Sequence, residues 1–205
     1  MNRWLGWFGA LALLACALPW SLNPGAGLSL NPIDLAEWTS LNPAVQAQTP
    51  TLLATFLLRT PLLIVALLFA LATSRSARPL AVLLLLLLSA GQLPPFEFLG
   101  DLGNANFQQQ ALMAVLTLII GLLTLMLFPH PRALLAGAIV ALAGLLAAVI
   151  GAANAFAEMR AFGLPALIGP GLAIYSAALA GAATFPLLQA GIKKRRACTP
   201  PSVLV

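Results

Sequence analysis

Charged residues are scarce in this chain, and their scarcity excludes an ordinary soluble domain. They make up 7% of the 205 residues, whereas soluble globular domains carry about 25%. Hydrophobic residues make up 61%, which leaves too few polar side chains to cover a water-facing surface. We therefore expect an integral membrane protein whose main surroundings are the lipid bilayer.

Histidine and cysteine are almost absent as well, which excludes most catalytic and metal-binding patterns. The single histidine, His130, lies in Phe-Pro-His-Pro-Arg and is expected in a turn. Cys16 and Cys198 lie far apart, without metal-ligand spacing. The chain also contains no nucleophile elbow and no phosphate loop. We therefore predict no haem, no His-based triad, no metal site and no other cofactor.

What the chain does contain is long apolar stretches. Each is about long enough to cross a bilayer as a helix, and lipid favours helices because they satisfy their own backbone hydrogen bonds. We therefore predict an all-α integral membrane protein: a single domain over residues 1–205, built as a bundle of about six transmembrane helices. The predicted spans are 4–20, 51–72, 79–93, 111–128, 133–156 and 166–190.

Charge placement predicts the orientation of this bundle. Eight basic residues fall on one side, which the positive-inside rule makes cytoplasmic: Arg3, Arg75, Arg78, Arg132, Lys193, Lys194, Arg195 and Arg196. All five acids, Asp34, Glu37, Glu97, Asp101 and Glu158, fall on the other side. We expect both termini in the cytoplasm, a longer extracytoplasmic loop over residues 21–49, and a location in the cell membrane. The net charge of +5 is scattered among apolar spans, so nucleic acid is not an expected partner.

The start of the chain allows a second interpretation. Arg3 followed by an apolar run and Leu-Leu-Ala-Cys at residues 13–16 resembles a bacterial lipoprotein signal, in which Cys16 would be acylated after cleavage. We favour an uncleaved first helix.

The tetrapeptide SLNP occurs three times before the second span, at residues 21–24, 29–32 and 40–43. Asn-Pro steps initiate turns, so we expect three turns that fold the loop into a compact cap. Between the second and third copies, residues Pro32–Ser40 are predicted to form a short helix with proline in its first turn and acids near its positive end. The repetition alone implies no binding motif.

Small residues recur along the last two spans. Gly137, Gly144 and Gly151 are seven residues apart, and Ala177 and Gly181 repeat the small-residue step. Such spacing lets helix backbones approach closely. We interpret it as packing between these two helices, with contact to a partner subunit as the alternative.

Arg59 is the charged residue predicted to lie inside the bilayer, about 12 Å along the second span. A charge at that depth requires a partner. The candidates are Glu37, Glu97, Asp101 and Glu158, and a structural ion pair is favoured over a ligand contact. Together with Arg160, these residues are the candidate polar contacts, and we expect the outer loops to form one polar platform.

The expected function rests mainly on what is missing. With no acid near the bilayer centre and no catalytic motif, we expect a non-catalytic multi-pass membrane protein, an accessory or structural subunit of a larger membrane complex with protein partners. The alternative is a small permease or channel component whose path passes Arg59. A third possibility is an intramembrane enzyme that uses Glu97, Asp101 or Glu158.

Overall fold

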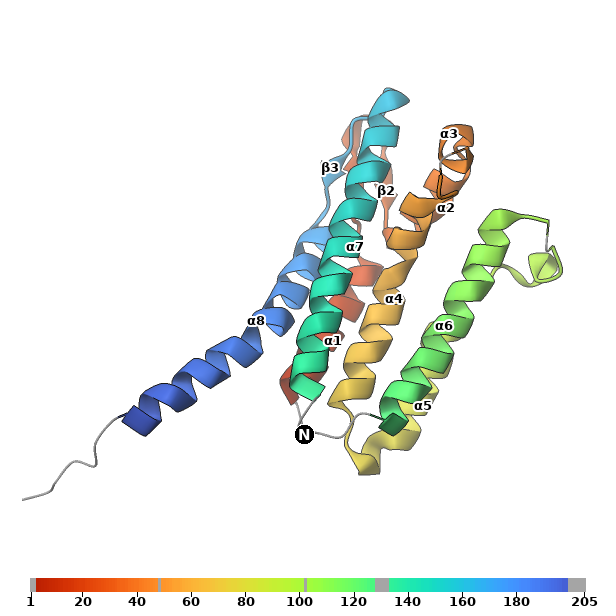
Figure 1. Cartoon of the computed structure of the whole chain (residues 1–205). Coiled ribbons are helices and arrows are strands. Elements are labelled where there is room, and N and C mark those ends of the chain that lie inside the picture. The colour runs from red at the N-terminus through yellow and green to blue at the C-terminus, as the bar shows by residue number, and fades with distance from the viewer. Residues whose placement is uncertain (1–2, 48, 102, 128–132, 199–205) are drawn as a thin grey trace, which may run out of the picture.

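A computed structural model describes residues 3–47, 49–101, 103–127 and 133–198, with residues 187 and 190–198 described by their backbone alone. Within these ranges, six long helices run side by side and smaller elements cap one end of the bundle (Figure 1). The long helices are α1 (Arg3–Ala17), α4 (Leu53–Ala72), α5 (Arg78–Ala90), α6 (Ala105–Leu127), α7 (Ala133–Ala161) and α8 (Pro170–Cys198). Each overlaps one of the predicted spans.

Helix α4 occupies the middle of the bundle. It packs against α1 and α7 on one side and against α5 and α6 on the other, while α8 packs on α1 and α7. Its residues Val65, Ala66 and Leu68 are fully buried. In Figure 1, α5 and α6 form one edge of the bundle, and α8 leaves the opposite edge toward its C-terminal end.

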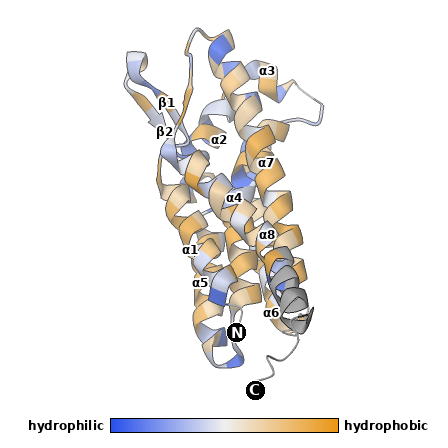
Figure 2. Cartoon of the chain, turned by 90° about the vertical axis from the view of Figure 1, so that its left-hand side faces the viewer, coloured by the Kyte–Doolittle hydropathy of each residue, from blue (hydrophilic) through white to orange (hydrophobic). Residues whose placement is uncertain are grey.

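Three helices in the described part of the chain are long and apolar enough to cross a membrane: α4, α6 and α7. Helix α1 is apolar but has only 15 residues. Hydrophobic residues follow the length of the helices, and hydrophilic residues gather toward the ends of the bundle (Figure 2). The protein is thus mostly helical, as predicted, and three of its described helices are candidates for crossing the membrane.

The all-α prediction is wrong in one respect, because the cap contains a small antiparallel sheet in the order β2-β1-β3. Its strands are β1 (Ser21–Asn23), β2 (Leu28–Leu30) and β3 (Leu167–Ile168). Ser21 is paired with Leu30 on one side and with Ile168 on the other. Residues Leu167 and Ile168 therefore do not begin the last helix, which starts at Pro170. A short apolar run fits a strand as well as a helix.

The three SLNP copies share one structural role: each asparagine is the N-cap of a helix whose first residue is the following proline. The helices are η1 (Pro24–Ala26), α2 (Pro32–Ser40) and α3 (Pro43–Gln46). The side-chain oxygens of Asn23, Asn31 and Asn42 accept hydrogen bonds from backbone N–H groups two or three residues ahead. Asparagine at the cap and proline at the first position are both favourable for helix initiation. The repeat thus starts three helices, one of them the predicted Pro32–Ser40.

Two long helices reach farther into the cap than predicted. Helix α6 begins at Ala105, six residues before the predicted span, so Asn106 lies on a helix. Helix α7 continues to Ala161 and ends in a Schellman motif, in which Gly163 has φ 71° and the N–H of Leu164 donates to the carbonyl of Met159. The acids and amides at these helix ends are therefore held in fixed positions.

The last two helices, α7 and α8, pack together as predicted, but most of the seam glycines face other helices. A Cβ on Gly151 would lie 3.2 Å from the backbone nitrogen of Leu58 on α4, and one on Gly137 would touch the side chain of Leu5 on α1. Gly144 faces Ile64 of α4 as well as α8, and Gly181 on α8 faces Phe8 of α1. Ala177 is exposed. Small residues permit close approach without specifying which helix approaches. Here the glycines of α7 mainly contact α4 and α1.

Candidate functional site

The most buried charge among the described side chains is Arg59, which lies on the second turn of α4. Its side chain is 5% exposed, and its Nη2 atom lies 2.6 Å from Oε1 of Glu37 on α2. The carboxylate that Arg59 contacts is therefore one of the four that the sequence offered. Glu37 is 41% exposed, so the pair lies at the boundary between the bundle and its surroundings.

Helix α6 completes the environment of this ion pair. Nη1 of Arg59 donates to the carbonyl oxygen of Asn106 and to Oε1 of Gln109, while Nη2 also donates to Oδ1 of Asn106 at 2.6 Å. Glu37 accepts from the amide groups of Asn106 and Gln110 at 3.0 and 2.5 Å. The four N–H groups on the Nη atoms thus have acceptors, and the carboxylate accepts three hydrogen bonds. A buried charge is tolerable only when it is paired and hydrogen-bonded in this way.

A proline lies two residues after Arg59 without ending α4. Pro61 has no N–H to donate to the carbonyl of Leu57, one turn earlier. The hydroxyl of Thr60 donates to that carbonyl at 2.7 Å instead. The helix therefore continues past Pro61, and the proline ring forms part of the wall of an adjoining pocket.

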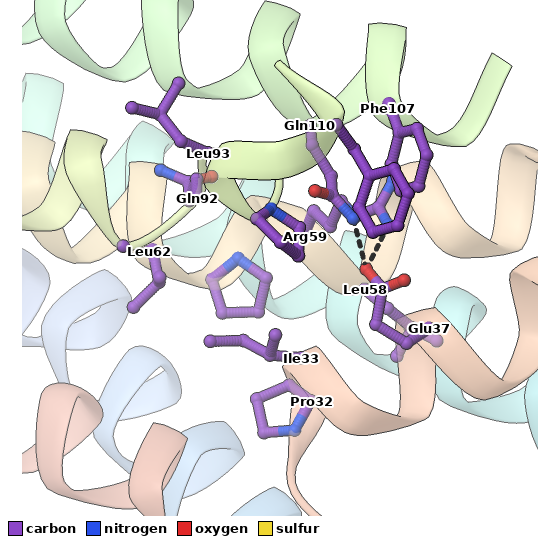
Figure 3. A pocket seen from close by; sticks show the side chains of 14 residues that line it. Pro32, Ile33, Glu37, Leu58, Arg59, Leu62, Gln92, Leu93, Phe107 and Gln110 are labelled. Carbon is purple, nitrogen blue, oxygen red and sulfur yellow. Dashed lines mark hydrogen bonds and ion pairs between the residues drawn. The ribbon is translucent and has the colours of Figure 1, made fainter. Parts of the chain in front are cut away.

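This pocket lies between α2, α4, the segment 91–98 that follows α5, and the start of α6, and it has a volume of about 290 Å³. Most of its wall is apolar, and it includes Ile33, Leu62 and the stacked rings of Phe98 and Phe107, whose centroids are 4.9 Å apart. Figure 3 shows the Arg59–Glu37 pair with Gln110 at one end of the pocket and Gln92 near the other.

Gln92 is a buried amide that is only partly satisfied. It is 7% exposed, and its Nε2 atom donates to the carbonyl of Leu88 and to the hydroxyl of Thr117. Its Oε1 atom is buried and has no hydrogen-bond partner among the described residues. Buried polar atoms are nearly always partnered, so this acceptor requires an explanation.

The other predicted polar contacts do not join this site. Glu97, Asp101 and Arg160 are exposed. Glu158 lies elsewhere in the cap, where it accepts a hydrogen bond of 2.7 Å from the amide of Asn42. Glu37 and Glu158 therefore hold different parts of the cap, where one platform was expected. His130 lies outside the described residues.

Sequence reasoning missed the amides that complete the site. Asn106, Gln109 and Gln110 precede the predicted span 111–128 and therefore fall in an outer loop by sequence alone. Their spacing of three and four residues places them on one face of a helix, and that face meets Arg59. Gln92 falls within the predicted span 79–93, but nothing in the sequence indicates its position in a pocket.

With this geometry established, comparison with known protein families, curated proteins and solved structures gives no match to the chain. The functional argument rests on the geometry alone.

Proposed function

We propose that this chain is a multi-pass protein of the cell membrane with six spans, α1, α4, α5, α6, α7 and α8, and with both termini in the cytoplasm. The distribution of charge along the bundle supports this arrangement. Basic residues lie at the start of α1, around the turn from α4 to α5, and at the end of α8, where the sequence has Lys-Lys-Arg-Arg at 193–196. All five acids lie at the capped end, which the positive-inside rule places outside.

Helices α1 and α5 are short for spans. With 15 and 13 residues, they measure about 22 and 20 Å at 1.5 Å per residue, against a hydrocarbon core of about 30 Å. Local thinning of the bilayer compensates for such a mismatch at modest cost. The buried side chains of Leu5, Ala12 and Ala15 support the retention of α1, because cleavage before Cys16 would remove all three from the core.

Within this architecture, the protein serves as a non-catalytic accessory subunit that presents its outer cap to a partner. The observation that carries this proposal is that the polar residues of the outer end hold the cap to the bundle. Arg59 and Asn106 hold Glu37 of α2, and Glu158 of α7 holds Asn42. A cap held by such contacts presents a fixed surface, which lowers the entropic cost of binding a partner.

The exposed surface of the cap includes large apolar side chains. Leu41, Phe96 and Phe162 are exposed by 76%, 87% and 57%. Apolar and aromatic residues of this kind are enriched where protein partners bind. We therefore place the partner contact on the cap and not on the α7 glycine seam, which is occupied within the chain.

The permease and enzyme alternatives have less support. The Nη groups of Arg59 are already taken by protein acceptors, so a passing ion would have to displace them. The three acids considered for catalysis, Glu97, Asp101 and Glu158, do not form a paired site in the described structure.

The test is copurification from native membranes in mild detergent, followed by mass spectrometry of the fraction that contains the chain. We expect a larger complex that dissociates when Leu41→Lys or Phe96→Lys is introduced, without a change in thermal melting. Leu142→Met, on the exposed face of α7, is the matched control and should leave the complex intact. Recovery of the unsubstituted chain only as a monomer or homodimer, with no partner crosslinked to residues 21–49, would contradict the subunit function.

A further inference from the structure

The end of the bundle opposite the cap carries positive charge without a balancing acidic side chain. Basic residues lie there at the start of α1, at the turn from α4 to α5 and at the end of α8 (Figure 1). All five aspartates and glutamates of the chain belong to α2, to the segment 97–101 or to the end of α7, at the capped end. Most of the counter-charge at the uncapped end has to come from outside the chain.

The largest group of these charges is Lys-Lys-Arg-Arg at residues 193–196, the basic segment, close to the end of α8. Helix α8 has 29 residues, which measure about 43 Å at 1.5 Å per residue. A hydrocarbon core of about 30 Å takes up about 20 of them. Counted from Pro170, the basic segment then begins about 5 Å beyond the core. This is the level of the lipid headgroups.

Helix α8 separates from the other helices before it reaches the basic segment. Its last buried residue among those with described side chains is Ala182. Pro186, one turn later, cannot donate a hydrogen bond to the Ala182 carbonyl, and helices bend most sharply at such prolines. Leu188 is 62% exposed. Figure 1 shows the end of α8 running away from α1 and α7.

The composition of this separated stretch matches the boundary between lipid and water. Residues 187–192 are Leu-Leu-Gln-Ala-Gly-Ile, and the basic segment follows directly. A straight continuation into water would leave this mostly apolar stretch uncovered, whereas a helix inclined along the interface has acyl chains for its apolar residues and headgroups for its cations.

Aromatic side chains lie beside α8 shortly before the stretch begins. The ring of Trp4 on α1 lies 5.0 Å from that of Phe185 on α8. Trp4 and Trp7 are 54% and 70% exposed. Exposed tryptophans are typical of the membrane–water boundary, so the two rings indicate that α8 reaches this boundary near Phe185.

We propose that the end of α8, residues 187–198, lies in the membrane interface and that the basic segment binds the headgroups of anionic phospholipids. Clusters of four or more Lys and Arg residues next to a span attract anionic lipids. Both residue types bind phosphate, lysine as a point charge and arginine through paired N–H groups. Binding of this kind requires the membrane location proposed above but not the subunit function.

The test titrates lipid onto the purified full chain in a neutral detergent and counts the bound lipids by native mass spectrometry. Dimyristoylphosphatidylglycerol is anionic, whereas dimyristoylphosphatidylcholine has the same acyl chains and no net charge. We expect the first phosphatidylglycerol to bind roughly tenfold more tightly than phosphatidylcholine. Equal binding of the two lipids would overturn the proposal.

Substitutions locate the binding. Replacing Lys193, Lys194, Arg195 and Arg196 together by glutamine should lower the affinity for phosphatidylglycerol to that for phosphatidylcholine. Arg195→Lys with Arg196→Lys keeps the charge and should keep the preference. Arg160→Gln, which removes an exposed charge at the capped end, should keep it too. A folded four-glutamine protein with an unchanged preference would overturn the proposal.

Melting of each variant without lipid shows whether it folds. If the four-glutamine protein does not fold, Lys193→Gln with Lys194→Gln takes its place. This variant should lose part of the preference for phosphatidylglycerol, and an unchanged preference would again overturn the proposal.

A soluble phosphate carries the same charge as a lipid headgroup, so a further titration separates the two. sn-Glycerol 3-phosphate has no acyl chains and, at the concentration of phosphatidylglycerol, should not displace the lipid. Displacement would overturn the assignment to a membrane lipid. All of these titrations use the isolated chain. Absence of a partner complex would therefore leave the lipid preference intact, and loss of the lipid preference would leave the subunit function standing.

Discussion

Arg59 on α4 holds Glu37, 22 residues earlier in the chain, through a hydrogen-bonded ion pair of 2.6 Å. The pair joins the short helix α2 to the middle of the bundle, and α6 supplies the amides on either side of it. One contact thus connects the cap to two long helices. Its removal should affect the cap before it affects the rest of the bundle.

The first prediction concerns the stability of this connection. Arg59→Leu should lower the free energy of unfolding by about 1 to 3 kcal/mol, because it leaves the Glu37 carboxylate without its charge partner. Removing one partner of a fully buried pair costs about 3 to 5 kcal/mol. The expected cost here is lower, because Glu37 is partly exposed and water screens its charge. Denaturant titration in detergent would measure the difference.

A second substitution separates the ion pair from the packing of the arginine stem. Glu37→Gln in the Arg59→Leu background should recover part of the lost stability, because no unpaired charge then remains. Asp101→Asn, on an exposed acid, is the control and should recover nothing. If Arg59→Leu leaves the melting temperature unchanged, the pair has no structural role.

The second prediction concerns the repeated asparagine caps. Asn31→Ala should cost about 1 kcal/mol, because its Oδ1 atom accepts from the N–H groups of Ile33 and Asp34 at the start of α2. Asn31→Asp keeps an acceptor at the cap and should retain most of the stability. Thermal melting of the two variants compares the loss of the side-chain acceptor with its retention. Equal losses of stability would argue against an N-capping role for Asn31.

The third prediction concerns the place where the start of α8 crosses the end of α1. A Cβ on Gly169 would overlap the carbonyl oxygen of Pro19, which belongs to the backbone and cannot rotate away. The same glycine donates its N–H to the carbonyl of Trp20. Gly169→Ala should therefore destabilise the fold by about 1 to 3 kcal/mol, the usual cost of overpacking. Gly100→Ala, where nothing lies within 4 Å, should have little effect on melting.

The helices were largely predictable because the signals that define them are local. The apolar stretch at 51–72 is about as long as a bilayer requires, and it became α4. Helix α2 has the predicted bounds because proline at its first position and the acid after it both favour a helix start. In each case, neighbours in sequence carried enough information.

What the sequence could not predict depends on residues far apart in the chain. Strand β3 exists because Ile168 pairs with Ser21, and no pattern near residue 168 announces that pairing. The choice of Glu37 among four acids follows from how α2 folds back on α4. The glycine seam showed that a helix would approach α7 closely, but which helix approaches is a property of the whole bundle.

The fourth prediction concerns this seam. Gly151→Leu should destabilise the isolated chain, because a Cβ at this position already lies 3.0 Å from that of Leu57 and 3.2 Å from the backbone of Leu58. The same change at the exposed Ala177 should leave melting nearly unchanged. Melting of both variants in detergent, without a partner, makes the comparison. A Gly151→Leu protein that melts normally would mean that α7 does not pack closely on α4.

The last prediction concerns orientation in the membrane. Alkaline phosphatase is active only outside the cytoplasm, so a fusion after residue 45, in α3 of the cap, should be active. A fusion after residue 75, beside the basic turn between α4 and α5, should be silent, and one after residue 103 should be active again. The physical reason is that Arg75 and Arg78 disfavour passage of this turn across the bilayer.

Replacing both arginines by glutamine should weaken that preference and raise the activity of the fusion after residue 75. A fusion with lysines at the two positions is the charge-matched control. Activity after residue 75 together with silence after residue 45 would reverse the orientation, and activity at all three sites would mean that α4 does not span the membrane.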